Sequence, residues 1–202
     1  LSSLAVQARW LSRRLEYHIL GNHLLANAKA LLFAGHFFSG PEADHWIDLG
    51  HKLFCKQLSE QILSDGGHFE LSPMYHCIVL EDVLDVINLY RAYGRRTPDA
   101  WRNTATRMLS WLSAMVHPDG EIAFFNDAAL RAAPTLAFLR MYASRLNVSY
   151  EEPSDPVRFL AESGYMRVEK GRVAVIIDVA PIGPDYLPGH SHADTLSFEL
   201  SL

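Results

Sequence analysis

The feature that most constrains the fold is a change of hydrophobic period close to Tyr150. Up to about residue 146, apolar side chains recur at spacings of three and four, the period of a helix buried on one face. The segment 151–156 then brings two prolines and three acids, which is typical of a linker. Beyond it the apolar residues alternate, as in strands. The sequence therefore predicts an α+β, multidomain chain with helices first and an antiparallel sheet after them.

The pattern predicts six helices and three strands. The helices are expected over 4–17, 22–38, 41–62, 77–93, 99–116 and 128–146, the last interrupted or started by Pro134. The strands are expected over 164–168, 173–179 and 195–200, with a tight turn at Lys170-Gly171. We expect a helical domain over 1–149, a linker over 150–160 and the first strands of a β-domain over 161–202.

One turn motif occurs twice in the helical part. Asp65-Gly66 is followed by Phe69, and 54 residues later Asp119-Gly120 is followed by Phe124. A period of about 50 residues suits a helical hairpin as the repeating unit. Repeated hairpins close into an α/α toroid or stack into a solenoid. Because Asp-Gly turns are common, a chance match is the alternative.

The net charge of −5 argues against a nucleic-acid binder and against a basic membrane-surface protein. A local group of arginines, Arg9, Arg13 and Arg14, could still face an anionic ligand, although a solvated helix face is the simpler interpretation. No apolar run is long enough to cross a bilayer. Cys55 and Cys77 are expected as buried free thiols, with a disulfide between them as the alternative.

The chain begins without Met or a signal-peptide pattern, and residues 195–202 end within a predicted strand. We therefore expect both ends to be interior to a longer protein, so that localisation is not readable from them.

Three groups of polar residues could carry chemistry. Asn22 and His23 open a predicted helix, where amide and imidazole donors could neutralise a carboxylate; a polar helix cap is the alternative. Tyr75 lies in the titratable segment 67–76, where a phenol could act as acid or base; a Tyr packed by its ring is the alternative.

The third group is Gly189-His190-Ser191-His192-Ala193-Asp194. On an extended segment, His190, His192 and Asp194 project to one face, which is typical of a metal site. Metallo-β-lactamase-like hydrolases also carry His-x-His-x-Asp, but Thr195 stands where a further His would follow, and the preceding chain is helical. A purely structural pair of histidines is also possible.

In this order, these motifs resemble those of the heparinase II/III-like polysaccharide lyases. The cues are Tyr17 with Gly21-Asn22-His23, then Asp65-Gly66-Gly67 with 72–76, then 189–194 with Ser197-Phe198. The resemblance covers essentially all 202 residues. It implies the incomplete end of an α/α toroid followed by the start of an antiparallel β-sandwich.

The resemblance implies a lyase that cleaves uronic-acid-containing acidic glycans by β-elimination. It implies that Asn22, helped by His23, neutralises the uronate carboxylate, and that Tyr75 and His190 serve as acid and base in an order left open. It implies a structural zinc bound by His192, with further ligands beyond Leu202; Asp194 is either a ligand or a support for one. Relatives of this kind suggest a periplasmic or secreted protein.

Two other functions stay open. A toroid glycoside hydrolase would need two carboxylates across a cleft, and Asp65, Glu70 and Asp119 are candidates. A glycan-binding protein without activity would keep the cleft but lose a catalytic group. The particular acidic glycan and the oligomeric state are not indicated by the sequence.

Overall fold

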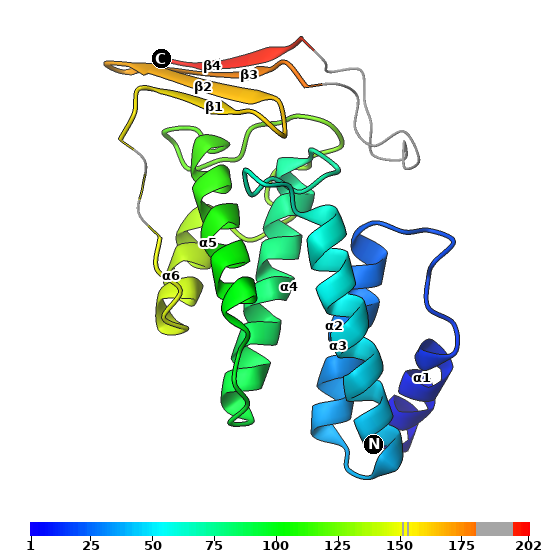
Figure 1. Ribbon diagram of the computed structural model, residues 1–202. Helices are drawn as coiled ribbons and strands as arrows, with labels where there is room; N and C mark the ends of the chain where they lie inside the picture. The colour runs from blue at the N-terminus through cyan, green and yellow to red at the C-terminus, as the bar shows by residue number, and fades with distance from the viewer. Residues whose placement is uncertain (151, 153, 181–195) are drawn as a thin grey trace. The chain divides into compact units, whose positions relative to one another are not determined.

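The computed structural model describes residues 1–150, 152, 154–180 and 196–202 (Figure 1). Over these residues helices come first and an antiparallel sheet last, so the predicted α+β class is confirmed. The helices are α1 (Ser2–Ser12), α2 (Asn22–Phe37), α3 (Pro41–Gln61), α4 (Pro73–Ala92), α5 (Asp99–Ala114) and α6 (Leu136–Arg145). The strands are β1 (Val157–Leu160), β2 (Tyr165–Lys170), β3 (Val173–Asp178) and β4 (Phe198–Ser201).

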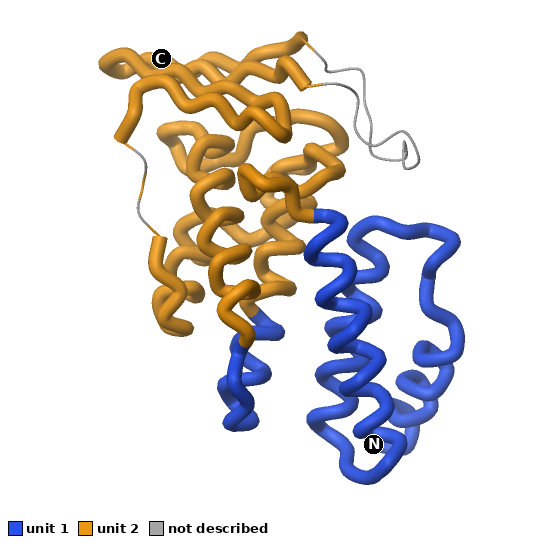
Figure 2. Tube along the Cα trace, in the orientation of Figure 1, with its two compact units in different colours: residues 1–61, 85–97 blue, residues 62–84, 98–202 orange. Residues whose placement is uncertain are grey.

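The chain folds into two compact units (Figure 2). The first contains residues 1–61 and 85–97, and the second contains residues 62–84 and 98–202. Helix α4 begins in the second unit and ends in the first. The boundaries predicted from sequence, at 149 and 161, describe a different division of the chain and stay predictions.

In the first unit, α2 and α3 form a tightly packed hairpin that depends on two glycines. A Cβ at Gly35 would lie 2.6 Å from Ile47 Cγ1, and one at Gly50 would lie 3.0 Å from the carbonyl of Ala28. The turn between the helices uses Gly40 at φ +101°, a value that L side chains rarely adopt. The absence of a side chain at Gly35 and Gly50 therefore sets how closely the two helices approach each other.

Helix α1 closes the core of the first unit over this hairpin. It ends at Ser12, earlier than predicted, but Leu15 still packs on the core from the following turn. The core cluster consists of Ala8, Leu31, Ala34 and Trp46, with Leu11, Leu15, Phe38 and Leu49 against it. An ion pair between Lys29 Nζ and Asp85 Oδ2, at 2.5 Å, joins α2 to α4 within the same unit.

In the second unit, the four strands pair in the order β1-β2-β3-β4, all antiparallel. The predicted turn between β2 and β3 is present, with Gly171 at φ +63°. The strand over 157–160 was not predicted, because it is short and follows two prolines. Tyr165, Ile176 and Asp178 are buried on the face toward the helices, and the sheet lies across the C-terminal end of α5 (Figure 1).

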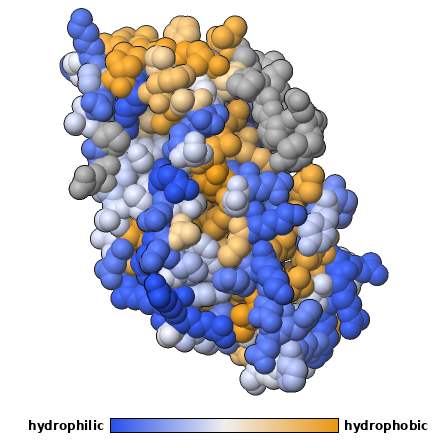
Figure 3. All heavy atoms as spheres, viewed as in Figure 1, coloured by the Kyte–Doolittle hydropathy of each residue, from blue (hydrophilic) through white to orange (hydrophobic). Residues whose placement is uncertain are grey.

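The other face of the sheet is apolar and open. One row across all four strands is Phe159, Met166, Ile177 and Phe198, and the next is Val157, Val168, Val175 and Leu200. Phe198 is 66% exposed, and the hydrophobic surface over the sheet is visible in Figure 3. Such a face is typical of one layer of a β-sandwich. This apolar face supports the predicted start of a β-sandwich. The sandwich and the toroid both remain predictions.

The duplicated Asp-Gly motif folds the same way in both places. Leu63 N–H donates to the carbonyl of Gly67 at 2.8 Å, and His117 N–H donates to that of Glu121, also at 2.8 Å. In each turn the aspartate accepts from the backbone two residues on, and the glycine has φ near 90° (Gly66 +96°, Gly120 +90°). The match is thus one of structure and not of residue types alone, which favours the repeated-hairpin hypothesis over chance.

Helix α6 begins after Pro134, as one of the two predicted alternatives has it, and the Thr135 side chain accepts from Phe138 N–H; residues 128–135 are not helical. Cys77 is buried as expected, but Cys55 is exposed, because the buried stripe of α3 passes through Phe54 and Leu58. Within the described ranges, none of the helices combines the length and apolarity that a bilayer crossing needs.

Candidate active site

Tyr75 is the predicted catalytic residue whose surroundings are best defined. It lies in the first turn of α4, in the second compact unit, and its side chain is only partly exposed. Burial raises the pKa of its phenol, and the negative charges of Asp127 and then Glu70 raise that pKa further. The hydroxyl is therefore protonated at neutral pH and is a proton donor in this state.

A fixed loop leads into Tyr75. The carboxylate of Asp65 accepts hydrogen bonds from Gly67 N–H at 2.9 Å and from both the backbone N–H and the hydroxyl of Ser163 at 2.8 Å. Trp111 Nε1–H donates to the same Ser163 hydroxyl at 2.8 Å. The loop is thus tied to α5 and to the turn before β2.

The two glycines of this loop are needed for space. A Cβ at Gly66 would collide with the carbonyl oxygen of Arg107, and one at Gly67 would lie 2.7 Å from Trp111 Nε1. Gly66 also has φ +96°. Because the backbone meets α5 this closely, the Asp-Gly-Gly sequence fixes the path of the chain toward Tyr75.

The last residues before α4 are held by a second set of bonds. Leu71 has φ +58°, and its carbonyl accepts from the Tyr165 hydroxyl at 2.7 Å and from Asn126 Nδ2 at 3.0 Å. Asn126 Nδ2 also lies 3.3 Å from the Tyr165 oxygen, and Asn126 itself has φ +56°. Tyr165 is fully buried. The sheet and the 125–127 segment therefore support the backbone four residues before Tyr75.

His76, next to Tyr75, has a structural role. It is fully buried, and desolvation lowers its pKa to about 4. Its Nδ1 accepts from His68 N–H at 3.3 Å, and its Nε2 lies 3.0 Å from the carbonyl of Met108, so Nε2 carries the proton. Its ring stacks on Trp111 at a centroid distance of 4.3 Å. A neutral imidazole with both nitrogens engaged does not shuttle protons.

Asn22 and His23 belong to the first compact unit, whereas Tyr75 belongs to the second. Asn22 is the first residue of α2, after Gly21 at φ +56°, and is partly exposed. His23 is exposed, with Nδ1 3.4 Å from Glu16 Oε2. Glu16 also accepts from Asn27 Nδ2 at 2.8 Å, and this bond lowers its pKa. His23 therefore has an anionic neighbour that can hold its ring.

The third predicted group lies outside the described residues. His190, His192 and Asp194 all fall within 181–195. Among the described residues, there is no group of three His, Cys, Asp or Glu side chains that could hold a metal ion. The zinc site implied by the resemblance thus receives no ligand set from the described part of the chain.

Sequence reasoning missed several residues around Tyr75. Glu70 was considered only as a hydrolase carboxylate, and Asp127, Asn126 and Tyr165 were not singled out. The polar pair Asn126-Asp127, directly after the apolar run 122–125, is the signal that marks a polar loop next to the core. The contact of Tyr165 with Leu71 joins positions 94 residues apart and leaves no local signature.

Solved structures define the class of fold. The structure described as "Crystal Structure of Heparinase III" matches with a TM-score of 0.82 at 20% sequence identity, covering 98% of this chain and 35% of that one. At this identity the likeness shows the fold alone: a helical portion that continues into an antiparallel sheet.

Sequence comparison then gives the family. The profile described as "Heparinase II/III N-terminus" matches residues 1–150, and "Heparinase II/III-like, C-terminal" matches residues 152–202. The chain belongs to the heparinase II/III family.

Two curated relatives that resemble this chain carry different names. A "Heparin-sulfate lyase" of Bacteroides stercoris is 32% identical over 117 residues, covering 56% of this chain and 18% of the relative. "FtsZ-localized protein C" of Caulobacter vibrioides is 29% identical over 182 residues, covering 87% of this chain and 29% of the relative. The chain therefore spans less than a third of the length of these two relatives.

Proposed function

We propose that the protein is a polysaccharide lyase that cleaves uronic-acid-containing acidic glycans by β-elimination. The observation that carries the proposal is the setting of Tyr75, a partly exposed phenol that a rigid loop, held by Asp65 and Tyr165, leads into. Family membership and a relative named as a heparin-sulfate lyase support the same reaction class.

In the proposed reaction, a base takes the C5 proton of the uronate and the C4–O bond breaks. The electron pair of the C–H bond forms the C4=C5 double bond, and an acid protonates the departing oxygen. We assign the acid to Tyr75, because its phenol is protonated at neutral pH and its raised pKa disfavours the phenolate that a base would need. The base is then His190, outside the described residues.

The developing charge on the uronate carboxylate needs a neutraliser. We assign this role to Asn22, with His23 beside it, since an amide N–H and an imidazole N–H both donate to a carboxylate. Glu16 supports this role, because its carboxylate lies 3.4 Å from His23 Nδ1 and can hold the ring in place.

Two of the three carboxylates considered for a glycoside hydrolase have structural roles in turns. Asp65 is engaged by Gly67 and Ser163, and Asp119 accepts from Glu121 N–H in the matching turn, so both act as turn-stabilising residues. Glu70, buried and close enough to affect Tyr75, keeps the alternative testable. A non-catalytic role is the second alternative, since one relative is named only for its localisation with FtsZ.

The test uses the full-length protein with heparan sulfate, alginate, hyaluronan and glucuronan, and follows the ultraviolet absorbance of the unsaturated product. A rise that is lost in Tyr75→Phe but kept in Tyr93→Phe, at an exposed position, is the expected result. New reducing ends without absorbance would replace the lyase with a hydrolase, and Glu70→Gln would then be the variant to examine. Neither signal on any glycan would favour a binding protein.

We also propose that His192 contributes to a structural zinc site and that the protein is periplasmic or secreted. Both proposals rest on the family and not on the described residues. Metal analysis of the full-length protein and of its His192→Ala variant tests the first, and cell fractionation tests the second. Equal zinc content in both proteins would remove His192 from the site.

A further inference from the structure

Three carboxamide side chains are buried inside the first compact unit. Asn27 from α2 is 6% exposed, and Gln57 and Gln61 from α3 are 2% and 0% exposed. A carboxamide at such a position gives up its hydrogen bonds to water, so it is tolerated only where the protein replaces them. The partners of these three side chains therefore show what the carboxamides hold in place.

Gln61, the last residue of α3, is bonded to the turn in front of α2. Its Nε2 donates to the carbonyl of Gly21 at 2.7 Å and to Oε1 of Gln57 at 2.7 Å. Both acceptors require the amide nitrogen of Gln61, so the orientation of this amide is set. The Gly21 carbonyl also accepts from Leu24 N–H at 3.1 Å, within the first turn of α2. Gln61 therefore anchors the residue directly before Asn22.

The chain enters α2 through two consecutive residues with a left-handed backbone. Leu20 has φ +66°, and Gly21 has φ +56° with ψ −147°. A leucine adopts this conformation rarely, and the conformation persists only where neighbouring contacts hold it. The buried bond from Gln61 to Gly21 is a contact of this kind. Strained backbone of this sort is concentrated at functional sites, and the side chain that follows it here is that of Asn22.

Asn27 fixes an earlier point of the same loop. Its Oδ1 accepts from Glu16 N–H at 2.9 Å, and its Nδ2 donates to Glu16 Oε2 at 2.8 Å. The same carboxylate oxygen lies 3.4 Å from His23 Nδ1. A buried side chain in the second turn of α2 thus determines where the Glu16 carboxylate lies, and that carboxylate limits where the ring of His23 can lie.

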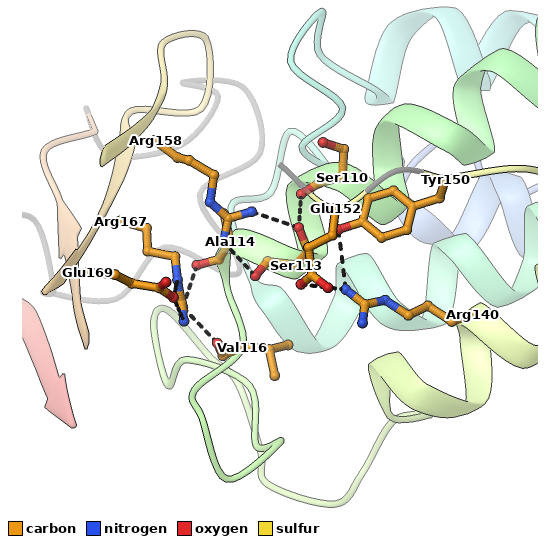
Figure 4. Close-up of polar contacts among 10 residues, drawn as sticks. All are labelled: Ser110, Ser113, Ala114, Val116, Arg140, Tyr150, Glu152, Arg158, Arg167 and Glu169. Carbon is orange, nitrogen blue, oxygen red and sulfur yellow. Dashed lines mark hydrogen bonds and ion pairs between the residues drawn. The ribbon is translucent and has the colours of Figure 1, made fainter. Parts of the chain in front are cut away.

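Two polar side chains of the second unit have a different kind of partner. Arg158 donates to the carbonyl of Ser113, and Arg167 donates to that of Val116, at and just beyond the C-terminal end of α5 (Figure 4). These arginines satisfy carbonyls that the end of a helix leaves without a partner, so capping explains them. The carbonyl bound by Gln61 already accepts from within its own helix. Capping therefore does not explain the bond from Gln61.

We propose that Gln61 and Asn27 are positioning residues for the two donors that bind the uronate carboxylate in the proposed reaction. Gln61 acts on Asn22 through the backbone before α2. Asn27 acts on His23 through Glu16. This inference rests on the proposed function. Donors that are fixed before the substrate arrives need no reorganisation when charge develops on the carboxylate, so both positioning residues lower the barrier without contacting the glycan.

The test is the lyase activity of the full-length protein, followed by the absorbance of the unsaturated product. Gln61→Met removes the donor and keeps a side chain of similar length. We expect kcat to fall by roughly tenfold and KM to change less than about threefold, because the donors act most strongly on charge that develops in the transition state. The matched control is Leu53→Ala, at a position on the same helix that is 4% exposed. It should lower stability in urea unfolding but keep kcat within about twofold.

Double-mutant cycles separate positioning from a general loss of structure. In an Asn22→Ala background, Gln61→Met should lower kcat by less than about twofold, since no amide is left to orient. Asn27→Leu should show the same lack of additivity with His23→Ala. Where Gln61→Met does not fold, Gln57→Leu takes its place, because it removes the acceptor that orients the Gln61 amide.

Fully additive losses in both cycles would overturn the positioning role, as would a Gln61→Met protein that is as active as Leu53→Ala. If the full-length protein cleaves no glycan, the proposed lyase function fails, and the same cycles are then measured as affinities for a glucuronan oligosaccharide by calorimetry. Non-additive losses of affinity would keep the positioning role. Additive losses, or no binding, would overturn it together with the lyase function.

Discussion

The hydroxyl of Tyr165 donates a 2.7 Å hydrogen bond to the carbonyl of Leu71, and this bond fixes the strained residue that precedes the helix of Tyr75. Tyr165 comes from β2, whereas Leu71 comes from the loop before α4. The position of the proposed acid therefore depends on how the sheet packs against the helices of the second unit.

Tyr165→Phe should lower stability and slow the proposed reaction without abolishing substrate binding. Loss of the hydroxyl leaves the Leu71 carbonyl with Asn126 as its remaining side-chain donor, at a cost of about 1–2 kcal/mol. Urea unfolding measures this cost, and kcat should fall while KM stays close to that of the wild type. An unchanged kcat, with Tyr75→Phe inactive, would show that this bond does not position Tyr75.

Gly66 and Gly120 form a matched pair for testing the repeated turn. Both have positive φ, but an added Cβ collides with Arg107 at Gly66 and meets open space at Gly120. We expect Gly120→Ala to cost about 1 kcal/mol from backbone strain alone. Gly66→Ala should cost about 3 kcal/mol or more, because the clash adds to the strain. Equal losses in urea unfolding would mean that the contact with α5 is not needed.

His76 should make stability fall in mild acid. An unfolded chain protonates this residue below pH 6.5, whereas the folded protein does so only below about pH 4, so protonation favours unfolding. The loss of stability caused by His76 is absent above pH 6.5 and grows as the pH falls. It reaches on the order of 3 kcal/mol below about pH 4. Urea titrations at several pH values should show a shallower slope in His76→Gln than in His45→Gln, an exposed position. Parallel slopes in the two variants would exclude His76 as the source.

Ser163→Ala should weaken the tie between the sheet and the Asp65 loop. The hydroxyl donates to Asp65 and accepts from Trp111 Nε1–H, and Ser163 is only 1% exposed, so both side chains lose a buried partner. We expect a loss of about 2 kcal/mol and a change in tryptophan fluorescence. Ser144→Ala, at an exposed site on α6, is the control and should leave both unchanged.

The sequence predicted the elements well because hydrophobic period is a local property. Helix α2 and strands β2 and β3 begin and end within two residues of their predicted positions. Proline also marked the start of α6 to within a few residues. The repeated Asp-Gly turn was visible because both copies need the same backbone and therefore the same residue types.

The candidate site was less predictable because its partners are distant in the chain. His117 Nε2, for example, lies 2.6 Å from Glu199 Oε2 in β4, and the two residues are 82 positions apart. Arg158 and Arg167 follow no spacing that suggests a shared contact with the end of α5. Tyr75 could be singled out, but its pKa is raised by burial and then by Asp127, which the fold brings near from 52 positions away.

The open apolar face of the sheet decides how a chain of these residues would behave when produced alone. Two rows of side chains, one ending at Phe198 and the other at Leu200, would meet water. Surfaces of this kind draw molecules together, so copies are expected to associate face to face as concentration rises. Turbidity and light scattering would detect this association. Polar substitutions along the two rows would be expected to reduce it.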